Sequence, residues 1–265
     1  MKLSAHLGFQ FNEVQFVDRF EAAAHCGYRA VEFPSPYGFA EGVLRGLLDA
    51  YDLQLVQIGA PMGHAAAGEK GMAALPGRRE EYLDSLVVAR DTALSLACPR
   101  VHVMAGVMTG GGEADWGAYV DNVHAAVELF GSAGIKTLVE VMSPQEVPGY
   151  FMSSFEQAEA LFAAIVDPNL ELLFDTYHAA VLARDPVALL AQWWPRIGHV
   201  QIADFPGRHE PGTGTLPFDR IFEQLASRDY RQWVGCEYRP LHDTASGLKY
   251  FERHLRSGGA PEEGA

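Results

Sequence analysis

Residues 170–203 read LELLFDTYHAAVLARDPVALLAQWWPRIGHVQIA and contain one complete unit of the fold. Two short runs rich in Leu, Ile, Phe and Val begin at Leu170 and Ile197, and they have the length and composition of buried strands. The segment between them is helical in character and carries a start signal, Asp185 followed by Pro186. This order of strand, helix and strand predicts two parallel strands joined by a right-handed crossover.

The same alternation recurs in both directions from this unit. Helix signals include Asn12 with Gln15, Gly27 after a helix end, and Ser153 with Glu156 as a capping box. Eight apolar runs predict strands, beginning at Leu3, Tyr28, Leu53, Arg100, Lys136, Leu170, Ile197 and Trp233. Eight such units favour a closed (β/α)8 TIM barrel over an open doubly wound sheet, and no G-x-G-x-x-G follows the first run.

The chain has 265 residues, and barrels of this kind run to about 250 residues as one domain. No linker or repeat divides the sequence, so we expect a single barrel domain over residues 1–256. Residues 257–265, SGGAPEEGA, have the composition of a flexible C-terminal tail. Long connections are uncommon in compact domains and often cover a site, so residues 60–79 and 205–218 are expected to lie near one.

Composition excludes several classes of protein. With 48% hydrophobic and 20% charged residues the chain is not of the disordered class. A net charge of −14 disfavours nucleic-acid and membrane partners, because it repels phosphate backbones and anionic lipids. Cys26, Cys98 and Cys236 form no C-x-x-C and predict neither a disulfide framework nor a thiolate zinc site. Without an apolar run that suits a signal peptide or a membrane span, the sequence predicts a cytoplasmic protein.

Polar side chains stand near the C-terminal ends of four consecutive predicted strands: Glu140, Asp175, Gln201 and Glu237. In a TIM barrel this end carries the chemistry, and neighbouring strands bring inward side chains together. Three buried carboxylates would repel one another unless a cation lies between them. Their oxygen ligands favour a hard ion such as Mg²⁺ or Mn²⁺. The alternative is that each acid caps a strand end or pairs with an arginine, which is common for one residue but not for four in register.

Several blocks of sequence resemble a known family: VEFPSPY from Val31, ALPGR from Ala74, HVMAGV from His102, VEVMSP from Val139, FDTYHA from Phe174, HVQIADFPGRHEPGTG from His199 and GCEYRP from Gly235. Through them the chain closely resembles the hydroxypyruvate isomerase family. That family belongs to the xylose-isomerase-like TIM barrels, alongside ketose 3-epimerases and endonuclease IV. The resemblance covers nearly the whole chain and implies the same barrel fold.

The resemblance also implies roles for individual residues. In the family a divalent metal is held by Glu, Asp, Gln and Glu at the ends of strands five to eight, which correspond here to the four strand-end residues. Glu140 and Glu237 would also form the proton-transfer pair. The 3-epimerases usually have His as the third ligand, so Gln201 favours the hydroxypyruvate isomerase branch. His178 and Arg208 match positions that contact substrate, and Arg208 is expected to pair with a substrate carboxylate.

The implied reaction interconverts hydroxypyruvate and tartronate semialdehyde through an enediolate, whose charge the metal would stabilise as a Lewis acid. Which glutamate is the base stays open. Glu32 ends the second predicted strand and is expected to bind substrate hydroxyls at the same opening, with a structural ion pair as the alternative. His6, His102 and His199 are interpreted as core histidines or as residues that support the ligands.

One departure from the family bears on the identity of the substrate. Hydroxypyruvate isomerases tend to have Asn just before the Ala-Pro after the third strand, whereas this chain has Ile58 and Gly59 there. A 2-oxo-tetronate isomerase and a ketose 3-epimerase are therefore alternatives on the same site. An inosose-dehydratase-like lyase, a metal-dependent phosphodiesterase and a non-catalytic sugar-acid binding protein are the other hypotheses. The expected partner is a small hydroxy or oxo acid, and a homo-oligomer is compatible with the sequence.

Overall fold

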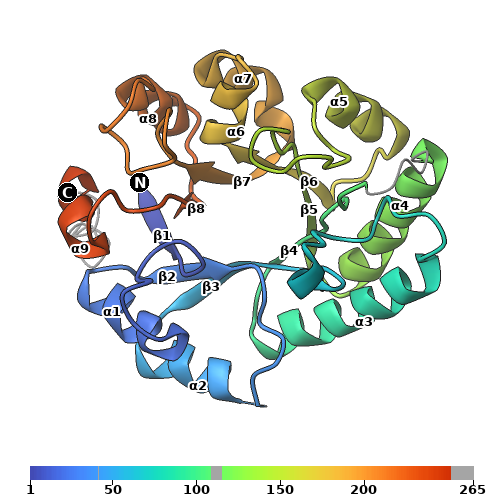
Figure 1. The fold of residues 1–265 in the computed structure, drawn as a ribbon, viewed down its shortest axis with the longest axis horizontal. Coiled ribbons are helices and arrows are strands. Elements are labelled where there is room, and N and C mark those ends of the chain that lie inside the picture. Colours follow the sequence, from blue (N-terminus) through green and yellow to red (C-terminus); the bar gives the residue numbers. More distant parts are fainter. Residues whose placement is uncertain (41, 109–114, 252–265) are drawn as a thin grey trace, which may run out of the picture.

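The computed structural model describes residues 1–40, 42–108 and 115–251. Eight parallel strands close into a barrel in sequence order, and helices surround it (Figure 1). This arrangement confirms the predicted TIM barrel. The strands are β1 (Lys2–His6), β2 (Ala30–Phe33), β3 (Gln54–Gly59), β4 (Arg100–His102), β5 (Lys136–Glu140), β6 (Leu170–Asp175), β7 (Ile197–Ile202) and β8 (Trp233–Cys236). The tail predicted for residues 257–265, and its boundary at 256, lie outside the described residues.

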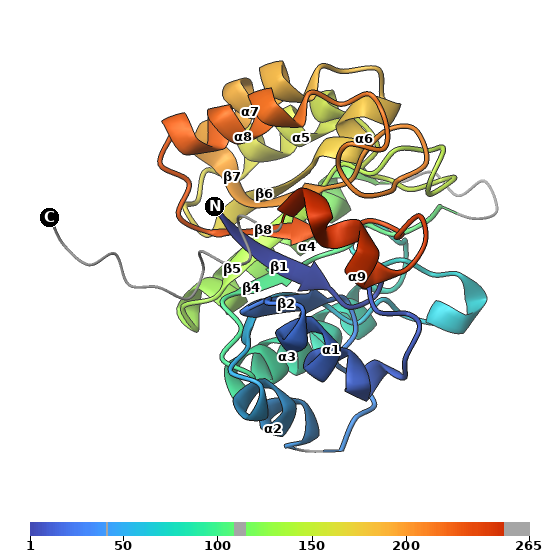
Figure 2. The same cartoon turned by 90° about the vertical axis from the view of Figure 1, so that its left-hand side faces the viewer.

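Helices follow most strands and pack against the outside of the barrel (Figures 1 and 2). They are α1 (Arg19–His25), α2 (Val43–Ala50), α3 (Arg79–Ser95), α4 (Trp116–Ser132), α5 (Phe155–Ala164), α6 (Thr176–Val181), α7 (Pro186–Trp193), α8 (Phe218–Ser227) and α9 (Thr244–Gly247). Aromatic contacts join the two layers, as where the rings of Phe20 in α1 and Phe33 in β2 lie 5.8 Å apart. None of the described helices combines the length and the apolar character needed to cross a membrane.

Two helices begin close to their sequence signals. Asp185 caps α7 as predicted, and its side chain accepts hydrogen bonds from the backbone N–H groups of Val187 and Ala188. The cap of α5 is one residue later than predicted. Ser154, not Ser153, accepts the hydrogen bond from the Gln157 N–H, and the glutamine side chain accepts one from the backbone of Ser153. The sequence has two serines in succession, and it does not show that Ser154 is the one with the extended backbone of an N-cap.

The first helix begins later than its signal suggests. Asn12 caps nothing, because its side chain donates to the carbonyl of Phe9. A short 3-10 turn over Phe16–Asp18 precedes α1, which begins at Arg19. Gly27 follows the helix with a φ of +94°, as expected of a residue just past a helix end.

The predicted fourth and fifth strands are shorter than their apolar runs. The ladder ends at His102 in β4 and at Glu140 in β5. Beyond β4 the chain bends into a connection, where Ala105 forms a bridge with Gly71. Apolar residues past the strand ends, such as Val103 and Val141, are also buried. The hydrophobic run in the sequence is therefore longer than the strand.

Two long connections lie at the C-terminal end of the barrel. The β7–α8 connection is organised by Asp204, which is fully buried and accepts hydrogen bonds from four backbone N–H groups, those of Phe205, Gly212, Gly214 and Leu216. The β3–α3 connection is held by an ion pair of 2.7 Å between Glu69 and Arg78. Both connections contribute side chains to the cavity described next.

Candidate active site

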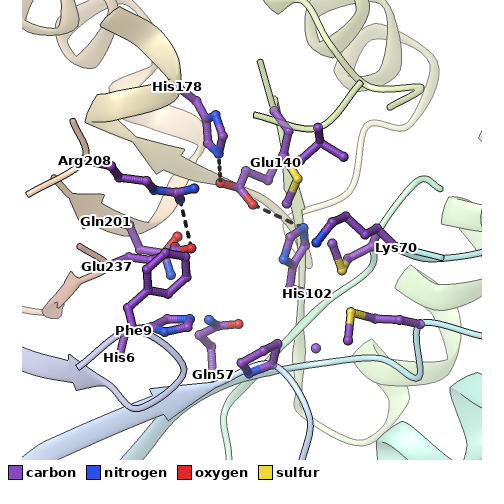
Figure 3. A pocket seen from close by; sticks show the side chains of 16 residues that line it. His6, Phe9, Gln57, Lys70, His102, Glu140, His178, Gln201, Arg208 and Glu237 are labelled. Carbon is purple, nitrogen blue, oxygen red and sulfur yellow. Dashed lines mark hydrogen bonds and ion pairs between the residues drawn. The ribbon is translucent and has the colours of Figure 1, made fainter. Parts of the chain in front are cut away.

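A cavity of ≈ 190 Å³ lies at the C-terminal ends of the strands (Figure 3). Pockets for drug-sized ligands have volumes of about 300–1,000 Å³, so this cavity suits a shorter molecule. Its walls combine apolar side chains with a few titratable ones. The lining residues are His6, Phe9, Pro34, Gln57, Gly59, Met62, Lys70, His102, Met104, Glu140, Met142, Val147, His178, Gln201, Arg208 and Glu237.

The four strand-end residues come together, as their register requires. Asp175 in β6 lies opposite Gln201 in β7, and Gln201 lies opposite Gly235 in β8. Asp175 and Glu237 meet at one guanidinium: Arg208 Nη2 is 3.1 Å from Asp175 Oδ2 and 2.9 Å from Glu237 Oε1. Glu140 completes the group, because an oxygen of its carboxylate, an oxygen of Asp175 and a ring nitrogen of His178 lie within 4.8 Å of one another.

Burial perturbs all three carboxyl groups of this cluster. Burial raises the pKa of Glu140 well above its usual range, and the charges of Glu237 and Asp175 add to the rise. The pKa of Asp175 is also raised by burial, although Arg208 opposes it. Burial raises the pKa of Glu237 to about 8 against the opposing effect of Arg208, with Asp175 contributing. One guanidinium therefore does not compensate three such acids, and a divalent cation would fit this excess of oxygen ligands.

Gln201 is oriented by a residue from the far side of the barrel. Its Nε2 donates to Glu32 Oε1 at 2.7 Å, which leaves Gln201 Oε1 buried without a hydrogen-bond partner among the described residues. That oxygen belongs to a residue lining the cavity and is free to accept a ligand. An amide held by its nitrogen end presents its oxygen in one direction, as a metal ligand requires.

Glu32 itself does not line the cavity. It is fully buried, and it accepts hydrogen bonds from Ser4 Oγ at 2.7 Å and from His199 Nε2 at 2.9 Å as well as from Gln201. Burial alone would raise its pKa, but His199 and the hydrogen bonds lower the pKa of Glu32 to about 2. The expected contact with substrate hydroxyls therefore needs correction: the geometry matches the alternative of a structural ion pair. Gly235 makes room for it, since a Cβ there would collide with the Glu32 carboxylate.

His178 presents a hydrogen-bond donor to the acidic cluster. The backbone N–H of Ser143 donates to His178 Nδ1 at 3.1 Å, so the neutral ring carries its proton on Nε2. Burial and the charge of Arg208 lower the pKa of His178 to about 3, which keeps the ring neutral. Nε2 lies 3.8 Å from Glu140 Oε1 and 4.0 Å from Asp175 Oδ2. A protonated Nε2 has no lone pair for a metal, so this tautomer suits a donor to a substrate oxygen.

Arg208 is buried although it lies in the β7–α8 connection. It is 5% exposed, and its guanidinium packs 4.8 Å from the ring of Phe9 and 5.3 Å from that of Tyr177. Besides Asp175 and Glu237, it reaches a third carboxylate, Glu146, at 3.5 Å. The expected role of pairing with a substrate carboxylate therefore competes with contacts that Arg208 already makes.

Sequence reasoning nominated neither Gln57 nor Lys70, yet both line the cavity. Gln57 carries a signal, since it is a polar residue on the inward face of the apolar run LQLVQI. Lys70 carries none, because it lies in an irregular connection whose course the sequence does not predict. His6 and His102 line the cavity from the ends of β1 and β4, and Figure 3 shows His102 facing Glu140, whose oxygen lies 3.8 Å away.

Comparisons with known proteins agree on the family. The family model described as "Xylose isomerase-like TIM barrel" matches residues 20–254. A 2-oxo-tetronate isomerase of Cupriavidus necator is 37% identical over 258 residues, covering 96% of this chain and 98% of the relative. The hydroxypyruvate isomerase of Escherichia coli is 35% identical over 254 residues, covering 95% and 98%. A crystal structure described as an AP endonuclease of family 2 from Brucella melitensis superimposes with a TM-score of 0.91 at 38% identity, covering 96% and 98%.

Proposed function

Because the chain belongs to the hydroxypyruvate isomerase family of xylose isomerase-like TIM barrels and is an isomerase of the aldose–ketose type, we propose that it interconverts hydroxypyruvate and tartronate semialdehyde with a divalent metal. The observation that carries this proposal is that Glu140, Glu237 and the free Gln201 Oε1 line one small cavity, while Asp175, which does not line it, joins them through Arg208. A binding protein would not need two glutamates placed beside its ligand to transfer a proton.

Glu140, Asp175, Gln201 and Glu237 would hold the metal. Their donors are all oxygens, which favours Mg²⁺ or Mn²⁺ over zinc. When bound, the metal would supply Lewis-acid stabilisation of the negative charge that develops on the substrate oxygens. Arg208 is in contact with Asp175 and Glu237, so it would keep these two carboxylates ionised and correctly oriented.

The reaction moves one hydrogen of the substrate between adjacent carbons. A glutamate carboxylate, Glu140 or Glu237, takes the proton from C3 of hydroxypyruvate and the same proton or another is returned at C2. The hydroxyl proton on O3 moves to O2, so no atom is gained or lost. His178 would donate its Nε2–H to the oxygen on which charge accumulates.

A four-carbon 2-oxo-tetronate is the second candidate substrate. A relative of that name is 37% identical over almost the whole chain. Gly59 lines the cavity without a side chain, at the position where the sequence departs from hydroxypyruvate isomerases. The missing side chain opens no space there, because a Cβ would lie 2.7 Å from the carbonyl oxygen of Pro34, so this candidate rests on the relative.

A coupled assay tests the proposal. Chelator-treated protein is given hydroxypyruvate or a 2-oxo-tetronate, with and without Mg²⁺ or Mn²⁺. Auxiliary reductases follow the aldehyde formed from hydroxypyruvate or the 3-oxo acid formed from the 2-oxo-tetronate. We expect metal-dependent turnover that falls by about 10²- to 10⁴-fold in Glu237→Gln, because a proton-transfer group is lost. Glu80→Gln, an exposed change in α3, is the matched control and should keep full activity. Full activity of Glu237→Gln would refute the mechanism.

Analysis of the product separates the isomerase from the other reactions. A lyase loses one water from its substrate, whereas an isomerase conserves the mass, so mass spectrometry of the product distinguishes them. An endonuclease activity, as named for the Brucella protein, requires a cavity that accepts a phosphate backbone. The net charge of −14 and the acidic cluster disfavour such a substrate here.

A further inference from the structure

The cavity has two walls of opposite character. The β5–β8 wall carries Glu140 and Glu237, the acidic residues among the described lining. The other wall comes from β1, β3, β4 and the β3–α3 connection, and it carries histidines, Gln57 and Lys70. Figure 3 shows Lys70 and His102 on the side of the cavity opposite Arg208 and Glu237. The carboxylate of an anionic substrate would be repelled by Glu140 and Glu237 wherever a cation does not compensate them, and it would be attracted to a cation on the second wall.

Lys70 and Arg208 are the two basic side chains of the lining with a permanent charge at neutral pH, and they differ in their partners. Arg208 contacts three carboxylates. Lys70 pairs with no carboxylate in the part of the chain that the structure describes. Its neighbour Glu69 is already engaged by Arg78 and by the backbone N–H of His64. Lys70 is therefore the cation whose charge is available to a ligand.

The backbone beside Lys70 is fixed to the barrel. The N–H of Gly71 donates to the carbonyl of Met62 at 3.1 Å, and Gly71 bridges Ala105 beyond β4. Gly71 has a φ of +99°, and a Cβ there would collide with the carbonyl oxygen of Met104. This close approach requires glycine at position 71, and it fixes the position of the neighbouring Lys70 backbone.

Gln57 supplies a second, independent sign of a ligand on this wall. Its side chain projects from β3 and is 3% exposed, and its Oε1 has no hydrogen-bond partner among the described residues. A buried amide oxygen without a partner costs about 1–3 kcal/mol and is rare in native structures unless a water or ligand completes it. The ligand would have to donate to this oxygen, as a substrate hydroxyl does, while the N–H₂ group of the same amide is a donor to carboxylate oxygens.

We propose that Lys70 and the Gln57 amide bind the carboxylate of the substrate, so that its reacting carbons lie toward Glu140 and Glu237. This inference rests on the proposed function in taking the substrate to be a short oxo acid. It makes Lys70 the residue that distinguishes such acids from neutral sugars of equal length. Arg208 then serves the carboxylate cluster and does not bind the substrate carboxylate.

The test compares an acid with its neutral counterpart. Hydroxypyruvate and dihydroxyacetone have the same carbon count and the same reacting carbons, but only the first has a carboxylate. We expect Lys70→Met to raise KM and Kd for hydroxypyruvate about 10- to 100-fold, the effect of losing one charge-assisted hydrogen bond. kcat should stay within a few fold, and the parameters for dihydroxyacetone should change little. Lys70→Arg should restore most of the loss, and the exposed Lys249→Met should behave as the parent protein.

Binding measured by calorimetry on metal-loaded protein keeps this inference separate from the proposed reaction. If no substrate turns over but hydroxypyruvate binds with a Kd that depends on Lys70, the reaction is wrong and the carboxylate site stands. If Lys70→Met leaves the Kd of hydroxypyruvate unchanged, the inference is overturned. Equal losses for the acid and the neutral ligand, without rescue by Lys70→Arg, would also overturn it, because they indicate altered packing and not a lost charge.

Discussion

At the scale of single residues, the site depends on side chains that do not line the cavity. Gln201 separates Glu32 from the cavity. An ionised carboxylate only accepts hydrogen bonds, so Glu32 binds the nitrogen end of the Gln201 amide and leaves the oxygen end for the cavity. Ser143 acts in the same way on His178, where a backbone N–H selects the tautomer. In both cases one hydrogen bond determines whether the neighbouring group offers a lone pair or a proton.

We expect Glu32→Gln to lower the affinity for Mn²⁺ by about 10- to 100-fold, the usual effect of losing a partner that orients a ligand. The new amide would no longer force the Gln201 nitrogen toward β2. Titration calorimetry measures the affinity, and circular dichroism verifies that the variant is folded. Glu171→Gln is the control, because this partly buried acid at the other end of β6 pairs with Arg100 outside the cluster. Unchanged Mn²⁺ affinity in folded Glu32→Gln would contradict the orienting role.

At the scale of elements, the strands bring the ligands together and the connections close the cavity. Neighbouring parallel strands hold Asp175 and Gln201 at one height because their backbones are hydrogen-bonded in register. The connections have no such ladder. The β7–α8 connection depends on the four hydrogen bonds accepted by Asp204, and the β3–α3 connection depends on close packing around Gly71.

Two glycines of the β3–α3 connection separate packing from backbone strain. Gly77 has a φ of +73° and nothing near its missing Cβ, so Gly77→Ala should cost only the strain, about 1–2 kcal/mol. Gly71→Ala adds a collision with Met104, and we expect a loss of about 2–5 kcal/mol. Urea denaturation measures the free energy of unfolding of each variant. Equal losses would show that the packing around Gly71 contributes nothing.

At the scale of the whole molecule, the barrel places several carboxylates close together at one end, in a chain whose net charge is already negative. The net charge is −14, and the cluster places three largely buried carboxylates at one end of the barrel. Repulsion in such a place destabilises the folded state unless a cation compensates it. Stability of the barrel and occupancy of the site are therefore linked.

Metal binding should raise the thermal stability of the protein. A ligand at 100 times its Kd stabilises the folded state by about 2.7 kcal/mol, which corresponds to an increase in Tm of about 5–11 °C for a chain of this size. Scanning calorimetry of chelator-treated protein, with and without Mn²⁺, measures the shift. The increase should disappear in Asp175→Asn combined with Glu140→Gln. A shift that persists in this double variant would place the metal elsewhere.

The sequence by itself determined the barrel and the four strand-end residues of the candidate site. Strand and helix periods are local properties, and the parallel topology brings the ends of successive strands to one edge, so Glu140, Asp175, Gln201 and Glu237 could be grouped without coordinates. Helix starts were less predictable, as Asn12 shows, because several residues near a helix end can compete for the cap.

Only the tertiary structure decided which partners these residues have. Glu32 and Gln201 are 169 positions apart and meet across the barrel, so no local pattern relates them. Arg208 is inserted between carboxylates by a connection whose path depends on Asp204, and Lys70 reaches the cavity because Gly71 packs against the backbone of Met104. Charge pairing and loop packing depend on distances in space, and these exist only after the barrel has closed.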